Sequence, residues 1–335
     1  MLDADFSVDR REFTVRVTLR VAAGERLALF GPSGAGKTTV LETIAGLVQP
    51  TTGRIELGGR LLTSTEPPTR TVPVWRRHAG LLRQDPGLFP HLSVRANLSY
   101  ARDTPATPAE MTELAGQLGI AALLGARPAA LSGGQQHRVA LGRILLAHSQ
   151  VLLLDEPYTG LDEGLRRQLT ELVGALVQAR GVPAVLVAHE LESAQAFADR
   201  IAVIDAGQIL QDAPPEQVVL APASRRVAEL VGYRAFVPAD KDLLPVRGYA
   251  GVHPERITTG AHPDRGLVLE GTVLTRRPAG AGWEADLDTR GCVVTCRLPD
   301  KPPDPGGRLV VTALQPPYFD PDGAALAVPT GIGNS

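Results

Sequence analysis

The stretch "GPSGAGKTT" at residues 31–39 constrains the fold of this chain more than any other segment. It matches the pattern G-x-x-x-x-G-K-[ST] and lies between the apolar run "RLALF" and a segment with helical spacing. Glycines in such a loop let successive backbone N–H groups point at phosphate oxygens, and the N-terminus of the following helix adds its positive dipole end. The order strand, glycine loop, helix therefore predicts a nucleotide site.

Side chains at the end of this loop indicate how the nucleotide would be held. Lys37 would reach the β- and γ-phosphates, and the Thr38 hydroxyl would ligate Mg²⁺. We therefore expect a nucleoside triphosphate with Mg²⁺ as the bound species. The residues predicted to surround it in this segment are Gly31, Pro32, Ser33, Gly34, Ala35, Gly36, Lys37, Thr38 and Thr39.

Two further apolar runs end in side chains that suit hydrolysis of such a nucleotide. The run "VLLLDE" leaves Asp155 at the carboxyl end of a buried strand, where it can help hold Mg²⁺, and Glu156 can orient or deprotonate the attacking water. His189 ends a second run, where it can sense the γ-phosphate or bind the transition state, and the Gln84 amide could contact Mg²⁺ or the water. The predicted catalytic residues are Glu156, His189 and Gln84, and the predicted metal ligands are Thr38, Gln84 and Asp155.

A second glycine pair lies in "LSGGQQHR" at residues 131–138, ahead of a helical run. These glycines would sit at a helix N-terminus, where unsatisfied N–H groups and the helix dipole favour an anion. Because the loop at residues 31–39 already surrounds the phosphates from one side, a second set of groups from the same chain would compete for that space. We therefore predict that the second pair covers the γ-phosphate of a nucleotide held by another copy, in an isologous dimer. The residues assigned to this role are Ser132, Gly133, Gly134 and Gln135.

The pattern of apolar runs over the first two thirds of the chain predicts an α/β fold. Residues 2–30 form two alternating runs around a polar turn, followed by a short apolar strand. A helical pattern follows the phosphate loop and ends at Pro50, small helices are expected within about 85–130, and a longer helix is predicted over residues 163–180. Buried strands that alternate with helices indicate a mostly parallel sheet with helices on its faces.

The composition changes near residue 235. From there on Pro and Gly are dense, helical periodicity is lost and short alternating runs follow one another, which is typical of a small all-β barrel or sandwich. Residues 205–234 form the connection and include a helix in "PASRRVAELVG", and the last ten or so residues are expected to be disordered. The strands expected in the barrel are "GLVLEGTVLTRR", "WEADLD", "CVVTCRL" and "RLVVTAL".

Charge and cysteine content exclude several classes of protein. The 34 Lys and Arg against 36 Asp and Glu leave no basic excess for binding nucleic acid. Cys292 and Cys296 lack a second Cys/His pair that could complete a zinc site, so we expect buried or half-buried thiols in a reducing cytoplasm. The apolar runs are too short to span a bilayer, and Asp3, Asp5 and Asp9 argue against a signal peptide. We expect a soluble protein that something else would anchor at a membrane.

The ordered set of these motifs resembles the ATP-binding-cassette family over residues 1 to about 230, and "LSGGQ" is highly specific to that family. The resemblance implies ATP as the nucleotide. It also implies a P-loop NTPase cassette over residues 1–232, with a helical subdomain at about 85–150, and a regulatory β barrel of the OB, TOBE or MOP type at residues 233–335. The matched residues are Lys37 and Thr38 of Walker A, Gln84 of the Q-loop, Asp155 and Glu156 of Walker B, and His189 as the switch histidine.

One detail of the family pattern is altered in this chain, and a second is not fixed by a motif. Asp162 matches the D-loop that couples the two nucleotide sites, but the segment reads "YTGLD" where "LSALD" is common in importers. The family also stacks an aromatic side chain on adenine. Phe13, Phe6 and Arg10 all lie near the expected first hairpin, and Phe13 is the candidate, with core packing as the alternative role for the phenylalanines.

The extension after the cassette resembles that of an importer ATPase. "GVHPERI" is similar to the opening of the C-terminal barrel in importer cassettes, and "GLFPHLSVRANL" is similar to the segment that receives the permease's coupling helix. The whole looks most like the sulfate/molybdate group, and within it a molybdate-type ATPase. This implies a homodimer on the cytoplasmic face of the membrane, with permease subunits and, indirectly, an extracytoplasmic solute-binding protein as partners. An importer ATPase for sulfate, iron(III), a sugar or a polyamine is the alternative.

A different class of function is an ATP-gated regulator that works without a permease. In that hypothesis residues 235–335 bind an oxyanion, and the positive charges of "TRRP" at residues 275–278 and of Arg297 recognise it. The alternative role for these arginines is ordinary solvated charge at a sheet edge.

Overall fold

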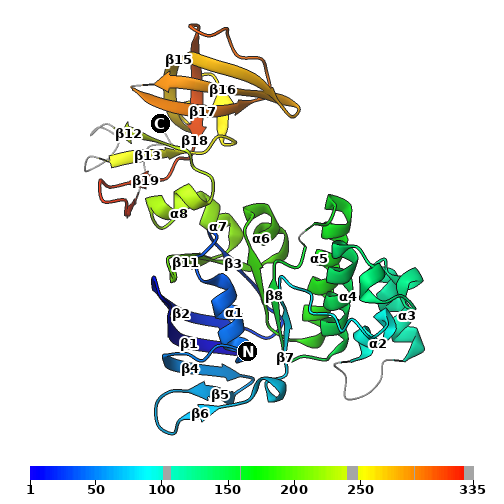
Figure 1. Ribbon diagram of the computed structural model, residues 1–335. Helices are drawn as coiled ribbons and strands as arrows, with labels where there is room; N and C mark the ends of the chain where they lie inside the picture. Colours follow the sequence, from blue (N-terminus) through cyan, green and yellow to red (C-terminus); the bar gives the residue numbers. More distant parts are fainter. Residues whose placement is uncertain (101–106, 159, 240–247, 290, 328–335) are drawn as a thin grey trace. The chain divides into compact units, whose positions relative to one another are not determined.

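The computed structural model describes residues 1–100, 107–158, 160–239, 248–289 and 291–327 (Figure 1). The chain divides into two compact units, Met1–Pro215 and Glu216–Ser335. The cassette boundary that we placed after residue 232 stays a prediction. The disorder expected at the C-terminal end concerns a segment that lies largely outside the described residues.

A large mixed sheet forms the centre of the first unit. Its order is β6-β5-β4-β1-β2-β11-β10-β3-β9-β8-β7. The strands from β10 to β7 pair in parallel through β3, β9 and β8, whereas β1, β2, β4, β5 and β6 are joined by antiparallel pairs. The expected parallel arrangement is thus the part of the sheet that carries the phosphate loop. The strand bounds are β1 Leu2–Asp9, β2 Thr14–Val21, β3 Arg26–Phe30, β4 Thr52–Leu57, β5 Arg60–Ser64, β6 Arg70–Thr71, β7 Ala79–Leu82, β8 Val151–Asp155, β9 Ala184–Ala188, β10 Arg200–Asp205 and β11 Gln208–Ala213.

Burial along the strands follows from their positions in the sheet. β1 and β2 form the predicted hairpin and alternate buried and more exposed side chains, as expected for strands with one covered face. Every residue of β8 and β9 is buried, because a central parallel strand is covered on both faces. This is why both runs are continuously apolar and why their polar continuations emerge together at one sheet edge.

The helices of the first unit are α1 Lys37–Ala45, α2 Val94–Ser99, α3 Pro108–Gln117, α4 Gly133–Leu146, α5 Glu163–Arg180 and α6 Leu191–Phe197. The helix α5 has the predicted bounds, since Asp162 caps its start and Gly181 ends it at a φ of 60°. The expectation that α1 runs to Pro50 is wrong. Gly46 adopts a φ of 87° and ends that helix with a left-handed cap.

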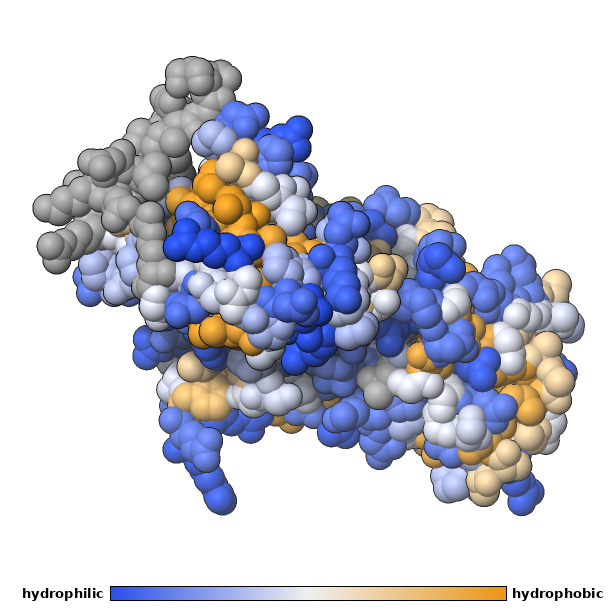
Figure 2. Space-filling view, turned by 90° about the horizontal axis from the view of Figure 1, so that it is seen from above, coloured by the Kyte–Doolittle hydropathy of each residue, from blue (hydrophilic) through white to orange (hydrophobic). Residues whose placement is uncertain are grey.

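Figure 1 shows α2, α3 and α4 grouped beyond the β7 end of the sheet. Short 3₁₀ segments at Ala121–Leu123 and Pro128–Ala130 lie between α3 and α4, as expected for small helices in the middle of the chain. Figure 2 shows mainly polar side chains on the viewed face, with apolar residues gathered at the end where Figure 1 places α2 and α3. None of the helices in the described ranges is long and apolar enough to cross a membrane.

The second unit begins with two short helices and continues as β structure. The helix α7 (Pro215–Leu220) starts at the unit boundary, and α8 (Arg225–Leu230) is the helix predicted in this connection. A four-stranded sheet has the order β12-β13-β19-β20, and a five-stranded sheet has the order β14-β18-β15-β16-β17. The edge strands β14 and β17 contact each other, so the larger sheet curls toward a half-barrel. The bounds are β12 Ala235–Ala239, β13 Gly248–Val252, β14 Ile257–Thr259, β15 Gly266–Ala279, β16 Gly282–Thr289, β17 Cys292–Leu298, β18 Arg308–Leu314, β19 Tyr318–Phe319 and β20 Ala325–Leu326.

The two cysteines lie on β17 as free thiols. Cys296 is fully buried among the apolar side chains of the curled sheet, and burial raises its pKa to about 12. Cys292 is half-buried at the start of the strand. Both therefore behave as part of the packing of this unit, as their alternation with valines predicts.

Candidate active site

The phosphate loop leaves β3 and enters α1 with glycines where a side chain would not fit. A Cβ on Gly31 would lie 1.9 Å from the Ile204 carbonyl oxygen. Gly36 caps the start of α1 with a φ of 102°, and within the described part of the chain no side-chain cap bonds to the first turn. The loop therefore presents bare backbone donors at a helix N-terminus, which is the arrangement that binds phosphate.

Lys37 is folded back onto its own loop. Its Nζ donates to the carbonyl oxygens of Gly31 at 2.7 Å and Pro32 at 2.8 Å, and the residue is only 7% exposed. Burial lowers the pKa of Lys37, while the carboxylates of Glu156 and Asp155 act in the opposite direction. The ammonium group thus lies between the loop and the acidic strand end, where incoming phosphate oxygens could replace the loop carbonyls.

Thr38 and Asp155, which the sequence predicts as metal ligands, meet directly. The Thr38 hydroxyl donates to Asp155 Oδ2 at 2.9 Å, although 117 residues separate them along the chain. Burial is the largest cause that raises the pKa of Asp155, and the hydrogen bond from Thr38 opposes it. A hydroxyl and a carboxylate oxygen are hard donors that suit Mg²⁺, a cation that takes few protein ligands when phosphates and water supply the rest.

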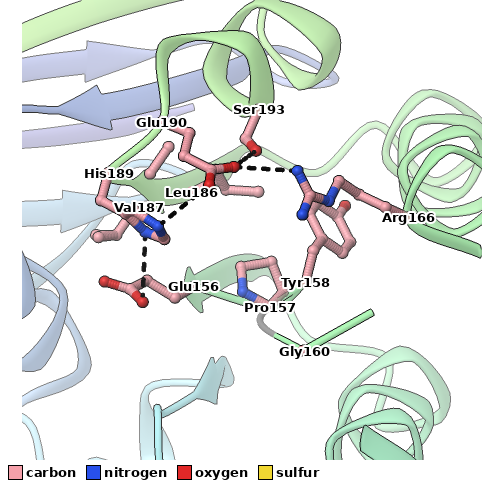
Figure 3. A pocket seen from close by; sticks show the side chains of 11 residues that line it. Glu156, Pro157, Tyr158, Gly160, Arg166, Leu186, Val187, His189, Glu190 and Ser193 are labelled. Atoms are coloured by element: carbon pink, nitrogen blue, oxygen red, sulfur yellow. Dashed lines mark hydrogen bonds and ion pairs between the residues drawn. The ribbon is translucent and has the colours of Figure 1, made fainter. Parts of the chain in front are cut away.

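Glu156 and His189 also lie together, because they follow the neighbouring parallel strands β8 and β9 (Figure 3). The distance from His189 Nδ1 to Glu156 Oε2 is 3.5 Å. Glu156 has a φ of 49°, and its N–H donates to the Val187 carbonyl oxygen at 3.3 Å. A left-handed backbone at a non-glycine residue is uncommon and concentrates at functional sites, so it supports a catalytic role for this carboxylate.

Gln84 occupies the same sheet edge but stays apart from these groups. It lies two residues beyond β7, the strand next to β8, and its side chain is exposed. Within the described ranges, its amide makes no hydrogen bond to Thr38 or Asp155. Gln84 therefore lies at the expected edge of the sheet, and its role as a metal ligand stays a prediction.

The second glycine pair begins α4, as predicted. Ser132 caps this helix, with its Oγ accepting from Gln135 N at 3.3 Å, and Gln135 Oε1 accepts from Ser132 N at 2.9 Å. Ser132 and Gly133 are exposed, so the helix N-terminus is open to an external anion. The hydrogen bonds of the described residues do not join this turn to the phosphate loop of the same chain.

Asp162 has a structural contact of its own. Its Oδ1 accepts from Leu165 N at 3.0 Å and so caps α5. The segment before it packs near the start of α4, since a Cβ on Gly134 would lie 3.7 Å from the Gly160 carbonyl oxygen. Asp162 and the second glycine pair are therefore neighbouring parts of one exposed surface.

The candidates for adenine stacking separate clearly. Phe6 is 3% exposed on β1 and belongs to the core. Phe13 is half-buried, and its Cε2 lies 3.6 Å from the position that a Cβ on Gly36 would take. Arg10 Nη2 donates to Thr39 Oγ1 at 3.0 Å. Phe13 is thus the aromatic side chain beside the phosphate loop, with Arg10 close by.

A pocket of about 120 Å³ adjoins Glu156 and His189 and is drawn in Figure 3. Its wall includes three polar residues that the sequence analysis missed, namely Arg166, Glu190 and Ser193. Arg166 comes from α5, and the other two come from the start of α6. No motif spacing relates α5 to the end of β9, although the acid directly after His189 could have drawn attention.

In the second unit, the arginines proposed to attract an oxyanion are paired with carboxylates. Arg276 pairs with Asp304, Arg277 pairs with Glu284, and Arg297 pairs with Glu255 and Glu284. Their positive charge is therefore compensated within the unit.

Comparison with known proteins relates the first unit to one large family. The family model described as ABC transporter matches residues 15–159. An Fe(3+) ions import ATP-binding protein of Mesorhizobium japonicum is 41% identical over 226 residues, which cover 67% of this chain and 62% of the relative. A second protein of that description, from Pseudomonas fluorescens, is 37% identical over 265 residues, which cover 76% of this chain and 73% of the relative. A molybdenum import ATP-binding protein of M. japonicum is 42% identical over 212 residues, covering 61% and 57%.

A solved structure shares the fold. The ATP-binding cassette MJ0796, determined as a dimer in a post-hydrolysis state with ADP and Pi, has a TM-score of 0.54 and 25% identity to this chain. The match covers 64% of this chain and 99% of that one. The extent of the match corresponds to the unit that carries the phosphate loop.

Proposed function

Since this chain belongs to the ATP-binding-cassette transporter family of ATPases, we propose that it is the ATP-hydrolysing subunit of an importer. The observation that carries the proposal is the convergence of Lys37, Thr38–Asp155 and Glu156–His189 at one edge of the parallel strands. These pairs join segments far apart in the sequence, and each supplies one part of the chemistry of phosphoryl transfer.

In this proposal each side chain has a task. The Lys37 ammonium and the N–H groups of the loop hold the β- and γ-phosphates, and Thr38 and Asp155 hold Mg²⁺. The cation, when bound, neutralises charge on the transferring phosphoryl group. Glu156 accepts the proton of the attacking water. His189, beside it, donates to an oxygen of the γ-phosphate.

The active form in this proposal is a homodimer that closes head to tail on two MgATP. Ser132, Gly133 and the other residues of the open α4 N-terminus then contact the γ-phosphate held by the second copy. The exposed position of that turn, next to the Asp162 segment, supports this arrangement. The related cassette MJ0796 was solved as a dimer with ADP and Pi. A nucleotide that bridges two chains shifts the equilibrium toward the closed form.

The proposed membrane partner is a permease that docks near α2. Phe89 and Tyr100 stack there with ring centroids 4.1 Å apart, and Tyr100 is 61% exposed. Phe89 is half-buried in the segment that resembles the importer docking site, and the exposed Tyr100 follows shortly after that segment, which supports contact with a coupling helix of the permease. The subunit would thus work at the cytoplasmic face of the membrane and depend indirectly on an extracytoplasmic solute-binding protein.

For the solute we propose molybdate or a similar oxyanion. Relatives named for molybdenum and for Fe(3+) import are 42% and 41% identical to this chain, so identity does not separate the two. In this proposal the ATPase machinery serves whichever solute the permease selects. Co-purification with the permease and uptake of labelled molybdate, iron(III) or sulfate into vesicles would identify the solute.

The regulator hypothesis, with an oxyanion bound by the second unit, has less support. It relies on Arg276, Arg277 and Arg297, whose charges are compensated by carboxylates. Calorimetric titration of the full chain with molybdate, tungstate and sulfate tests it. Tight selective binding in the absence of a permease would favour the regulator.

The ATPase proposal is tested by steady-state hydrolysis with Glu156→Gln. The purified chain should hydrolyse MgATP, and loss of the general base should reduce kcat by about 100-fold or more. Affinity for ATP should be retained, because the phosphate loop is untouched. Glu171→Gln, an exposed acid on α5, is the matched control. Equal rates for wild type and Glu156→Gln would refute the assignment.

A further inference from the structure

Glu190 lies directly after His189, and its carboxylate meets three side chains (Figure 3). Arg166 Nη1 donates to Glu190 Oε2 at 3.0 Å, and Ser193 Oγ lies 3.3 Å from the same oxygen. Glu190 Oε1 lies 3.7 Å from His189 Nε2. One carboxylate oxygen is therefore anchored by protein donors while the other faces the imidazole.

The anchor comes from a different element of the fold. Arg166 lies one turn into α5, and its N–H donates to the Asp162 carbonyl oxygen at 2.9 Å. Its side chain is 28% exposed and crosses the pocket wall to reach the first turn of α6. The Arg166–Glu190 pair thus ties the turn that begins at Asp162 to the segment that carries His189.

His189 needs such a support, because its side chain is 50% exposed. Glu156 Oε2 lies 3.5 Å from Nδ1 and Glu190 Oε1 lies 3.7 Å from Nε2, so the two carboxylates flank opposite nitrogens of the ring. A carboxylate beside the second ring nitrogen favours a proton on that nitrogen and so helps to orient a functional histidine. Without Glu190, the ion-pair partner of the imidazole among the described residues would be Glu156 alone.

We infer that Glu190 and Arg166 are positioning residues for His189, which extends the proposed ATPase function and rests on it. In this inference the pair acts through the imidazole, which Glu190 Oε1 faces. A partly exposed ion pair contributes little to stability, so its removal should change the rate and leave folding nearly unaffected.

Steady-state ATPase measurements with Arg166→Gln, Glu190→Gln and the double variant test this inference. Each single variant should lower kcat by about 10- to 100-fold, the effect of a misplaced catalytic group, with KM and the Kd for ATP within about twofold of wild type. Because both act through one contact, the double variant should be no slower than either single variant. The matched controls are Arg167→Gln and Glu192→Gln, exposed neighbours of the pair, which should leave kcat unchanged.

A second measurement reads the position of His189 without using activity. The chain has seven histidines, and His189→Gln assigns the ring signals of this residue in an imidazole NMR spectrum. Arg166→Gln and Glu190→Gln should shift those signals, and the two control variants should not. Unchanged signals, or kcat losses that multiply in the double variant, would overturn the inference. Shifted signals in a chain without ATPase activity would uphold the positioning role and refute the proposed function.

Discussion

The Asp155 carboxyl shows how a single functional residue can lower the stability of the folded protein. It is 5% exposed, and burial raises its pKa above the ordinary value of 3.8. A buried acid with a raised pKa favours the folded state most when it is protonated, and this contribution is lost as the pH rises through the folded pKa. The position is therefore costly at neutral pH unless a cation is bound beside it.

We predict that Asp155→Asn stabilises the nucleotide-free protein at pH 8, because the amide carries no charge to desolvate. The gain over wild type should shrink as the pH falls toward 3.8, the ordinary pKa of the carboxyl. Urea unfolding between pH 4 and pH 8 measures this difference. The same substitution should abolish the additional stabilisation that MgATP gives to wild type. A variant less stable than wild type at pH 8 without nucleotide would contradict the pKa direction.

The sequence predicts those residues of the site that belong to a motif located at the end of a strand or at the start of a helix. Lys37 and Thr38 follow from the loop pattern, and the carboxyl ends of parallel strands place Asp155, Glu156 and His189 at one edge. Arg166 and Glu190 could not be predicted in this way. Their contact depends on the crossing of α5 and α6, for which the residues carry no periodic signal.

At the scale of elements, the start of α1 depends on two loop glycines with left-handed backbone, Gly34 and Gly36. Gly36 at its start has a φ of 102°, and a Cβ there would lie 2.8 Å from Val15 Cγ2. Gly34 in the same loop has a φ of 82°, but a Cβ there would meet nothing within 4 Å. The two positions separate backbone strain from steric overlap.

Gly34→Ala should cost about 1 kcal/mol of unfolding free energy in the absence of nucleotide, from the left-handed backbone alone. Gly36→Ala should cost more than about 2 kcal/mol, because Val15 must also move. Chemical denaturation of the two variants provides the comparison. Equal losses would show that the loop relaxes around the added methyl group.

The end of α1 depends on a buried arginine. Arg77 is 1% exposed, and its guanidinium donates to the carbonyl oxygens of Thr43, Ile44 and Val72 and to Thr63 Oγ1. Burial lowers the pKa of Arg77 because it disfavours the charged form. The dipole of α1 favours a cation at the helix C-terminus and so offsets part of the free-energy cost of burying the guanidinium. This contact also explains why the helix stops before Pro50, since Gly46 leaves room for the guanidinium.

Removing this cap should destabilise the first unit strongly. Arg77→Ala removes four hydrogen bonds to buried acceptors, and we expect a loss of roughly 3 kcal/mol or more. The neighbouring exposed Arg76→Ala is the matched control and should cost less than about 0.5 kcal/mol. Thermal unfolding of both variants decides the question, and a small effect for Arg77→Ala would mean that water replaces the guanidinium.

Elements with strong local signals were the easiest to predict. The first hairpin, the helix over residues 163–180 and the four predicted strands of the second unit, β15 to β18, match their patterns, because burial on one face imposes a period on each. The end of α1 was not predicted, because the apolar spacing continues past Gly46 and the backbone conformation of that glycine overrides it.

At the scale of the whole molecule, each unit has its own core and its own fold class, an α/β sheet in Met1–Pro215 and all-β sheets in Glu216–Ser335. The change in composition near residue 235 predicts this division of fold class. Beyond the first hairpin, the antiparallel half of the large sheet was not predicted, because strand order depends on contacts between segments far apart in the chain.

The central claim is that ATP joins two copies of this chain through the open N-terminus of α4. Light scattering of Glu156→Gln with and without MgATP tests it most directly, with Lys37→Ala as the variant that should not bind ATP. We expect monomers without nucleotide, dimers of Glu156→Gln with MgATP, and monomers of Lys37→Ala under both conditions. Glu156→Gln that binds MgATP and remains monomeric would contradict it.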